Sequence, residues 1–153
     1  MTFEEMLERD GKLIYTNKGV SMMPLLRADR DVMVIEACRA SEVRKYDAVL
    51  FVRPGKTKNA YVLHRVLRLN PDGTFWIVGD NCCGGENVRG EQIIGRLKTV
   101  LRDGRSTEMT DWRYRCYVYL WCAPYPLRFV ILRMKSFVGK GWRFIKRTTG
   151  KGG

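Results

Sequence analysis

Short apolar runs rich in β-branched residues recur through the first hundred residues, and residues typical of turns bound each run. This pattern favours strands over helices, because β-branched side chains fit a pleated sheet while Gly, Pro, Asn and Asp interrupt it. Asn70-Pro71-Asp72-Gly73 predicts a turn that joins the fourth and fifth runs in a hairpin. We predict a mainly β fold with strands over residues 13–15, 31–38, 47–53, 61–69, 75–78 and 93–101.

Helices are expected at the two ends of the chain. Thr2 followed by Glu5 matches a capping box, which predicts a short helix over residues 3–9 that ends at Asp10-Gly11. Towards the other end, Asp111 is a good N-cap for a helix that Pro124 and Pro126 interrupt. The ranges expected there are helices over residues 112–122, 127–138 and 141–147, and the segment 79–90 is predicted to be a loop.

Charge divides the chain into a body and a tail. The 153 residues carry a formal net charge of +12, which favours an anionic partner. Residues 1–110 hold 18 basic and 15 acidic residues, whereas residues 111–153 hold ten basic residues and a single acid. We therefore predict a nearly balanced domain over residues 1–104 and a basic, partly helical tail over residues 105–153.

The sequence gives little support for a metal site, a disulfide-rich fold or a membrane-spanning segment. The five cysteines include the adjacent pair Cys82-Cys83 but no paired CxxC spacing, and His64 is the only histidine, so we expect no zinc site and no cofactor. Reduced thiols are expected, with no role assigned to the adjacent pair. The longest uncharged apolar run, residues 116–127, is too short to span a bilayer, and the acidic N-terminus is unlike a signal peptide.

Three short motifs contain candidate catalytic residues. Ser21 lies in Gly-Val-Ser-Met-Met-Pro, where Gly19 permits unusual backbone angles and main-chain N–H groups can bind an oxyanion. A serine nucleophile needs a base to accept its proton, and His64 is the only imidazole available. A carboxylate that orients this imidazole is expected at Asp80, in Gly-Asp-Asn, or at Glu86. Each motif alone also fits an ordinary turn or a core histidine, and their order along the chain is what favours catalysis.

These motifs together resemble the signal peptidase I family, within the wider signal peptidase and LexA-like serine peptidase superfamily. The resemblance spans residues 12–101 and includes Gly-Val-Ser-Met-Met-Pro, Tyr-Asp-Ala-Val-Leu-Phe, Leu-His-Arg-Val, Gly-Asp-Asn and Ile-Ile-Gly-Arg-Leu. It implies a catalytic β-fold over residues 1–104 and a serine endopeptidase that needs no metal and cuts leader or signal-like peptides after small residues.

The resemblance also implies roles for individual residues. Ser21 is the nucleophile, and His64 stands where the Ser–His branch of the family has its general base. Asp80 matches the family's Gly-Asp-Asn aspartate, while Glu86 lies near a further acid, so the supporting carboxylate stays open between them. Some relatives use a hydroxyl at the position of Gly19, so here the oxyanion depends on main-chain N–H groups, including that of Ser21.

A family of this kind acts on membrane-bound substrates, which bears on the tail. Aromatic and basic residues together favour the headgroup region of anionic bilayers, although they also fit single-stranded nucleic acid. We expect residues 111–149 to contact an anionic membrane surface, in preference to nucleic acid, and expect a cytoplasmic or peripheral membrane location with the extracytoplasmic face left open. The aromatic residues concerned are Trp112, Tyr117, Trp121, Phe129, Phe137, Trp142 and Phe144.

Two alternatives come from other classes of protein. A LexA-like regulator that cleaves itself would need a cleavage segment well before the serine, and only 20 residues precede Ser21. A non-catalytic binding module with a basic surface would keep the fold and the charge without the chemistry.

Overall fold

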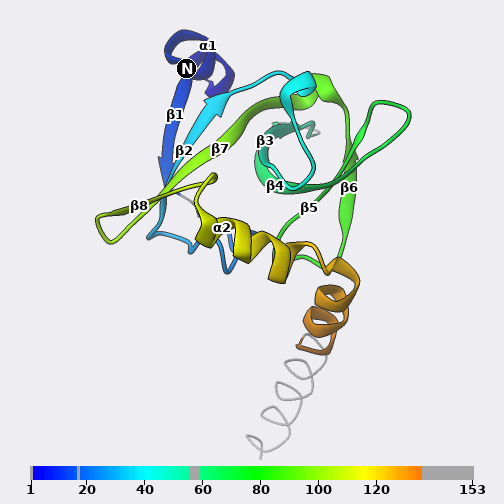
Figure 1. Ribbon diagram of the computed structural model, residues 1–153. Coiled ribbons are helices and arrows are strands. Elements are labelled where there is room, and N and C mark those ends of the chain that lie inside the picture. The colour runs from blue at the N-terminus through cyan, green and yellow to red at the C-terminus, as the bar shows by residue number, and fades with distance from the viewer. Residues whose placement is uncertain (1, 17, 56–58, 136–153) are drawn as a thin grey trace, which may run out of the picture.

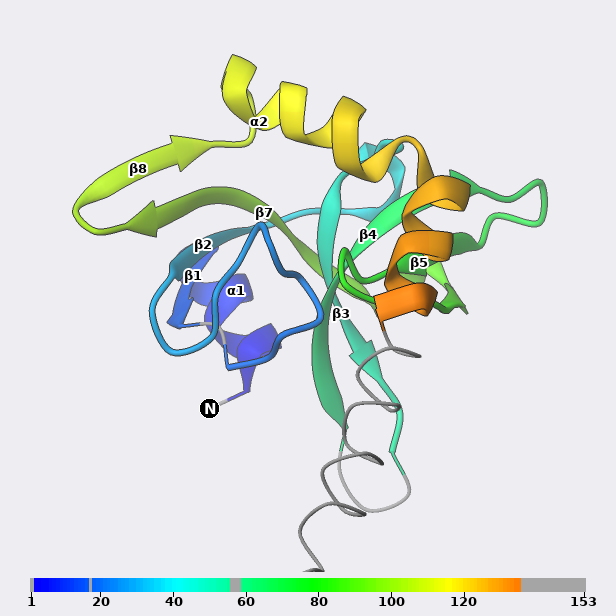
Figure 2. The ribbon, with the colours of Figure 1, turned by 90° about the horizontal axis from the view of Figure 1, so that it is seen from below.

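One antiparallel sheet organises the protein in the computed structural model, which describes residues 2–16, 18–55 and 59–135. Its strands are β1 (Lys12–Thr16), β2 (Val32–Ala37), β3 (Ala48–Arg53), β4 (Ala60–Leu69), β5 (Phe75–Val78), β6 (Gly85–Val88), β7 (Ile93–Arg102) and β8 (Arg105–Glu108). The strand order is β1-β2-β7-β3-β4-β5-β6, with β8 paired to β7. The sheet is strongly curved, as Figures 1 and 2 show. The prediction of a mainly β fold is confirmed, and all six predicted strands are present.

Two strands were missed by the sequence prediction. β6 lies inside the segment 79–90 that was predicted to be a loop, and β8 follows β7, which was the last strand predicted. Gly85 begins β6 because the chain passes close to β5: a Cβ there would lie 2.5 Å from Val78 Cγ2. Asp103 and Gly104 both have positive φ, which suits a two-residue hairpin turn rather than a simple stop.

The N-terminal helix forms as the capping box predicts. In α1 (Phe3–Asp10) the Thr2 hydroxyl accepts from the Glu5 N–H, and the Glu5 carboxylate accepts from the Thr2 N–H at 2.8 Å. Gly11 ends the helix in the left-handed conformation, with φ of 67°. The helix buries Leu7 and directs the chain into β1.

Apolar side chains fill both faces of the sheet. Successive residues of β3 alternate between two clusters: Ala48 and Leu50 join one with Met22 and Leu26, while Val49 and Phe51 join the other. This alternation follows from the two-residue period of a strand. The turn that contains Ser21 is anchored in the first cluster by Met22 and Leu26, both fully buried.

The expected tail packs on the body over its first part. Asp111 caps α2 (Trp112–Tyr117) by accepting from the Arg113 N–H, as predicted, and a π-helical turn, η3 (Val118–Cys122), continues it. Tyr114, Val118 and Cys122 form a third buried cluster against the body. Residues 123–124 interrupt the helix and residues 125–135 are helical again. The predicted helix over 141–147, and Phe137, Trp142 and Phe144, lie outside the described residues.

Candidate active site

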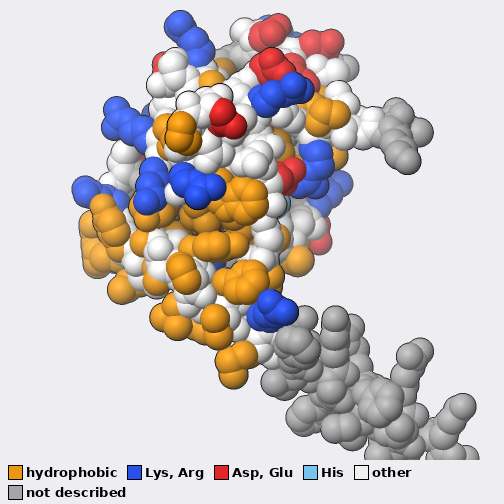
Figure 3. All heavy atoms as spheres, turned by 90° about the vertical axis from the view of Figure 1, so that its right-hand side faces the viewer, with side chains coloured by type: hydrophobic (Ala, Val, Ile, Leu, Met, Phe, Trp, Pro, Cys, Tyr) orange, Lys and Arg blue, Asp and Glu red, His pale blue; other side chains and the backbone are white. Residues whose placement is uncertain are grey.

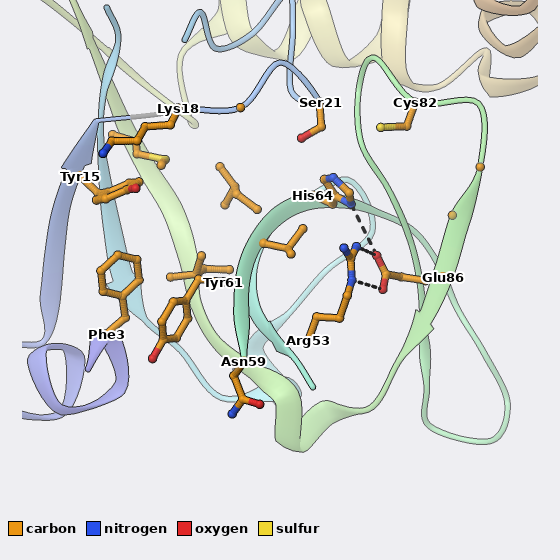
Figure 4. A pocket seen from close by; sticks show the side chains of 17 residues that line it. Phe3, Tyr15, Lys18, Ser21, Arg53, Asn59, Tyr61, His64, Cys82 and Glu86 are labelled. Carbon is orange, nitrogen blue, oxygen red and sulfur yellow. Dashed lines mark hydrogen bonds and ion pairs between the residues drawn. The ribbon is translucent and has the colours of Figure 1, made fainter. Parts of the chain in front are cut away.

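A pocket of about 810 Å³ is lined by residues of the Ser21 turn, of the strands β3 and β4 and of the β5–β6 connection. Figure 4 shows Ser21, His64 and Glu86 on the right-hand side of the pocket and the aromatic side chains Phe3, Tyr15 and Tyr61, from α1, β1 and β4, on its left-hand side. Apolar residues of the central strands, including Met33, Leu50 and Leu63, contribute to the wall. The pocket thus combines an apolar wall with a few polar groups, as ligand sites generally do.

The turn of Ser21 is tied to the Gly-Asp-Asn loop by main-chain contacts. The Asn81 N–H donates to the Ser21 carbonyl at 2.7 Å, and Asn81 Nδ2 donates to the Val20 carbonyl at 3.2 Å. Buried Met22 holds the turn from its other side. Asn81 is therefore a positioning residue for Ser21, a role that the sequence prediction did not assign because only the fold brings the two loops together.

His64 projects from β4 towards the same end of the pocket as Ser21 (Figure 4). Its side chain is 11% exposed and packs against Phe51 in an edge-on arrangement, with ring centroids 6.2 Å apart. Its Nε2 atom lies beside Gly79, where a Cβ would stand 3.0 Å from Nε2 and 2.8 Å from the Ser21 carbonyl oxygen. Gly79 therefore leaves room for the Ser21 carbonyl and the His64 imidazole to lie against the same point of the chain. Within the described residues no hydrogen bond joins the two side chains, and such bonds often tighten only when substrate binds.

Glu86, from β6, is the carboxylate nearest to the imidazole. Its Oε1 atom lies 3.8 Å from His64 Nδ1, the nitrogen opposite the one that faces Gly79. Arg53, at the end of β3, binds the same carboxylate with two hydrogen bonds: its Nε donates to Oε2 at 2.9 Å and its Nη2 donates to Oε1. Arg53 was not among the predicted site residues. It lies 33 residues from Glu86 along the chain, and only the strand order brings the two together.

Asp80 makes different contacts from those predicted. Its carboxylate is fully buried and accepts from Arg65 Nε at 2.7 Å and from Arg65 Nη2 at 2.6 Å. The Tyr117 hydroxyl donates to the same carboxylate at 2.7 Å, and Arg128 Nη1 lies 3.6 Å from it. No contact to His64 is among these, because Arg65 and His64 are neighbours on β4 and point to opposite faces. Of the two candidate carboxylates, the structure therefore brings Glu86 and not Asp80 to the imidazole.

Burial sets the protonation of the histidine. It lowers the pKa of His64 below its ordinary 6.5, because the charged form loses hydration; Arg53 acts in the same direction, whereas Glu86 and Asp80 oppose it. The imidazole is therefore neutral near pH 7 and free to accept a proton. When the imidazole accepts a proton, the negative charge of Glu86 beside Nδ1 can stabilise the imidazolium.

Other kinds of site are not found in the part of the chain that the structure describes. There, no three His, Cys, Asp or Glu side chains are grouped so as to hold a metal ion, and the five cysteines are unpaired. No helix among these residues is long and apolar enough to cross a membrane.

Comparison with known proteins adds no relative. No match is found to a family model, to a curated protein or to a solved structure. What can be concluded about function therefore rests on the residues of this pocket and on the motifs that contain them.

Proposed function

We propose that the protein is a serine endopeptidase with Ser21 as nucleophile, His64 as general base and Glu86 as the carboxylate that supports the histidine. The observation that carries the proposal is the arrangement around the imidazole, with Glu86 beside Nδ1 and the Ser21 turn on the side of Nε2. The same three roles occur together in serine peptidases of unrelated fold, where geometry rather than sequence order identifies them. The resemblance to the signal peptidase I family, which rests on motifs that contain Ser21 and His64, points to the same chemistry.

The reaction that these residues suit is acyl transfer. His64 Nε2 takes the proton of the Ser21 hydroxyl as Oγ attacks the carbonyl carbon of the scissile peptide bond. The tetrahedral intermediate collapses when the imidazolium gives that proton to the departing amine. Water, deprotonated by His64, then attacks the acyl-enzyme and releases the new carboxyl terminus, which regenerates the Ser21 hydroxyl.

The pocket supports a peptide substrate. Its volume of about 810 Å³ exceeds what a single side chain needs, and its wall runs from Ser21 to an aromatic group formed by Phe3, Tyr15 and Tyr61. Phe3 stacks on Tyr61 with ring centroids 4.4 Å apart. We infer that several residues of an extended leader or signal-like peptide occupy this space, with apolar side chains towards the aromatic end.

Replacement of the nucleophile tests the proposal. Wild type and Ser21→Ala are incubated with a peptide library, and new termini are identified by mass spectrometry. We expect the variant to lose about 1,000-fold or more in cleavage rate, since a missing nucleophile leaves only binding and oxyanion contacts. Ser41→Ala, at an exposed serine, is the matched control and should cleave as wild type does. Cleavage at the same bonds by Ser21→Ala would contradict the mechanism.

A further inference from the structure

The helix over residues 125–135 presents an apolar stripe to solvent. Leu127, Val130, Ile131 and Met134 follow the spacing i, i+3, i+4, i+7, which places them on one helix face. All four are exposed, Leu127 by 62% and Met134 by 63%, so this stripe does not pack on the body. A surface helix ordinarily turns such a stripe towards the core, and an exposed stripe marks a surface that binds something.

A second stripe lies on the preceding helical segment, α2 and η3. Trp112, Cys116, Tyr119 and Leu120 recur at four- and three-residue intervals and are exposed, Leu120 by 79%. Figure 3 shows hydrophobic side chains gathered over the part of the surface that the C-terminal helical segments form. Two consecutive segments therefore each expose an apolar stripe in addition to the side that packs on the body.

The charges carried by the two helical segments themselves have one sign. Residues 112–135 contain five basic residues and no acidic residue. Arg113, Arg115, Arg133 and Lys135 are exposed, while Arg128 is buried beside Asp80. Exposed aromatic and aliphatic groups with basic neighbours suit the headgroup region of an anionic bilayer, into which the apolar groups insert while the cations meet phosphate.

The surface is continuous with the turn that contains Ser21. A small groove between them is lined by residues of both segments, among them Met23 and Pro24 from the turn and Ile131 and Lys135 from the helix. Val20, next to Ser21, is 58% exposed. A partner that covers the helical stripes therefore also lies against one side of the turn.

We propose that the helical segments 112–122 and 125–135 dock this protein on the surface of an anionic phospholipid bilayer. Docking does not depend on the proposed peptidase chemistry, because none of its residues is Ser21, His64 or Glu86. The docking is peripheral: the apolar stripes lie in the headgroup region, and the helices lie parallel to the membrane plane. The turn that contains Ser21 then lies at the bilayer surface.

Vesicle binding by the full chain tests the proposal. The probes are vesicles of phosphatidylglycerol with phosphatidylcholine and vesicles of phosphatidylcholine alone, and bound protein is measured by co-sedimentation. We expect at least tenfold stronger partitioning to the anionic vesicles. The variant Leu127→Gln/Ile131→Gln/Met134→Gln should bind about tenfold or more weakly, because three apolar groups no longer insert. The variant Arg133→Gln/Lys135→Gln should lose about fivefold for each charge removed.

Matched controls separate docking from general stickiness. Ile14→Gln/Leu69→Gln removes exposed apolar side chains elsewhere, and Lys12→Gln/Arg105→Gln removes two exposed charges elsewhere. These variants should bind vesicles as wild type does. The proposal is overturned if wild type ignores both kinds of vesicle or binds them equally, or if the stripe variants bind like their controls. A single-stranded oligonucleotide that binds the chain and displaces it from anionic vesicles would likewise overturn it, in favour of nucleic acid.

The peptidase proposal and the docking proposal fail separately. Ser21→Ala should bind anionic vesicles as wild type does, and the stripe variant should still cleave soluble peptides. A chain that binds vesicles but cleaves nothing would keep the docking surface and lose only the catalytic assignment.

Discussion

An arginine–carboxylate ion pair lies on each side of β4, and the two pairs differ in burial. His64 and Arg65 are adjacent, yet one faces an open pocket and the other the interior. On the His64 side, Arg53 holds Glu86 in a pair whose side chains are 45% and 30% exposed. On the Arg65 side, Arg65 holds Asp80 in a pair with no exposure at all. Burial, and not the chemical type of the contact, therefore sets what each arginine–carboxylate pair contributes.

Burial changes both the energetics and the freedom of these groups. The interior pair has its donors and acceptors satisfied: Arg65 also donates to the Tyr46 carbonyl and the Tyr114 hydroxyl, and Tyr117 donates to Asp80. Burial raises the pKa of Tyr117, so its hydroxyl stays a neutral donor. Removing one partner from such a network leaves a buried charge without its counterion. Solvent screens the pair of Arg53 and Glu86, so this pair contributes little to the free energy of unfolding, and Glu86 can interact with the imidazole as well.

The largest expected effect is on the pocket side. His64→Gln keeps the volume of the side chain but removes the base, and we expect peptidase activity to fall by about 10,000-fold. The free energy of unfolding should change by only about 1 kcal/mol, because the neutral imidazole lies 3.8 Å from Glu86, beyond hydrogen-bond distance, and glutamine fills a similar volume. Kinetics and urea denaturation of the same preparation check both. A fall in the free energy of unfolding large enough to explain the loss of activity would contradict the separate roles of the two sides of β4.

On the interior side the same kind of change should act on folding. Asp80→Asn leaves buried Arg65 and Arg128 without a counterion, and we expect the free energy of unfolding to fall by about 3–5 kcal/mol. Urea denaturation followed by circular dichroism measures it. If instead Asp80→Asn retains full stability but shifts the pH profile of cleavage, Asp80 acts on His64 after all and the two sides of β4 are not distinct.

A smaller effect is expected where α2 contacts this network. Tyr117→Phe removes one hydrogen bond to a buried carboxylate, which should lower the free energy of unfolding by about 1.5–3 kcal/mol. Tyr61→Phe is the matched control, because its hydroxyl donates to Glu4 at the protein surface and its loss should cost about 1 kcal/mol or less. Equal costs for both substitutions would mean that burial does not set the strength of these bonds.

Glu86→Gln removes the charge of the carboxylate on the pocket side. The contact to His64 Nδ1 is 3.8 Å long and partly exposed, so we expect cleavage to fall by about 10- to 100-fold, less than when a buried triad carboxylate is lost. The free energy of unfolding should fall by about 1 kcal/mol or less. The control is Glu91→Gln, which removes the carboxylate of an exposed ion pair with Arg89. It should change neither the cleavage rate nor the free energy of unfolding.

The smallest effect concerns pH. Because burial lowers the pKa of His64 below 6.5, the acidic limb of kcat/KM should lie below that pH, where the base becomes protonated and activity declines about tenfold per unit. In Glu86→Gln the limb should move further towards acid, since a carboxylate that favours the imidazolium is gone. A limb above pH 6.5, or one that moves towards neutrality in the variant, would contradict the assigned contact.

Local patterns were sufficient for most elements and for the two central catalytic candidates. The capping box at Thr2, the N-cap at Asp111 and the β-branched runs act through contacts within a few residues, so they can be recognised in the sequence. β6 could not be recognised, because Gly85 and its neighbours have little preference for a strand and pair only where β5 offers a partner. Glu86 faces His64 because of that pairing, which opposes it to Ile77.

The residue pattern was sufficient to predict the mainly β class and both helix caps, and to indicate Ser21 and His64 as candidates for the proposed acyl transfer. It left two candidate carboxylates open, and the tertiary structure places one of them at the imidazole: the pleat of β4 turns Arg65 inward, where it binds Asp80, while the β5–β6 pairing brings Glu86 to His64 and Arg53. It also decided which helix faces remain uncovered in the tail. The reason is the same in each case, since both outcomes depend on what lies opposite a residue in space, and spacing along a chain does not encode that.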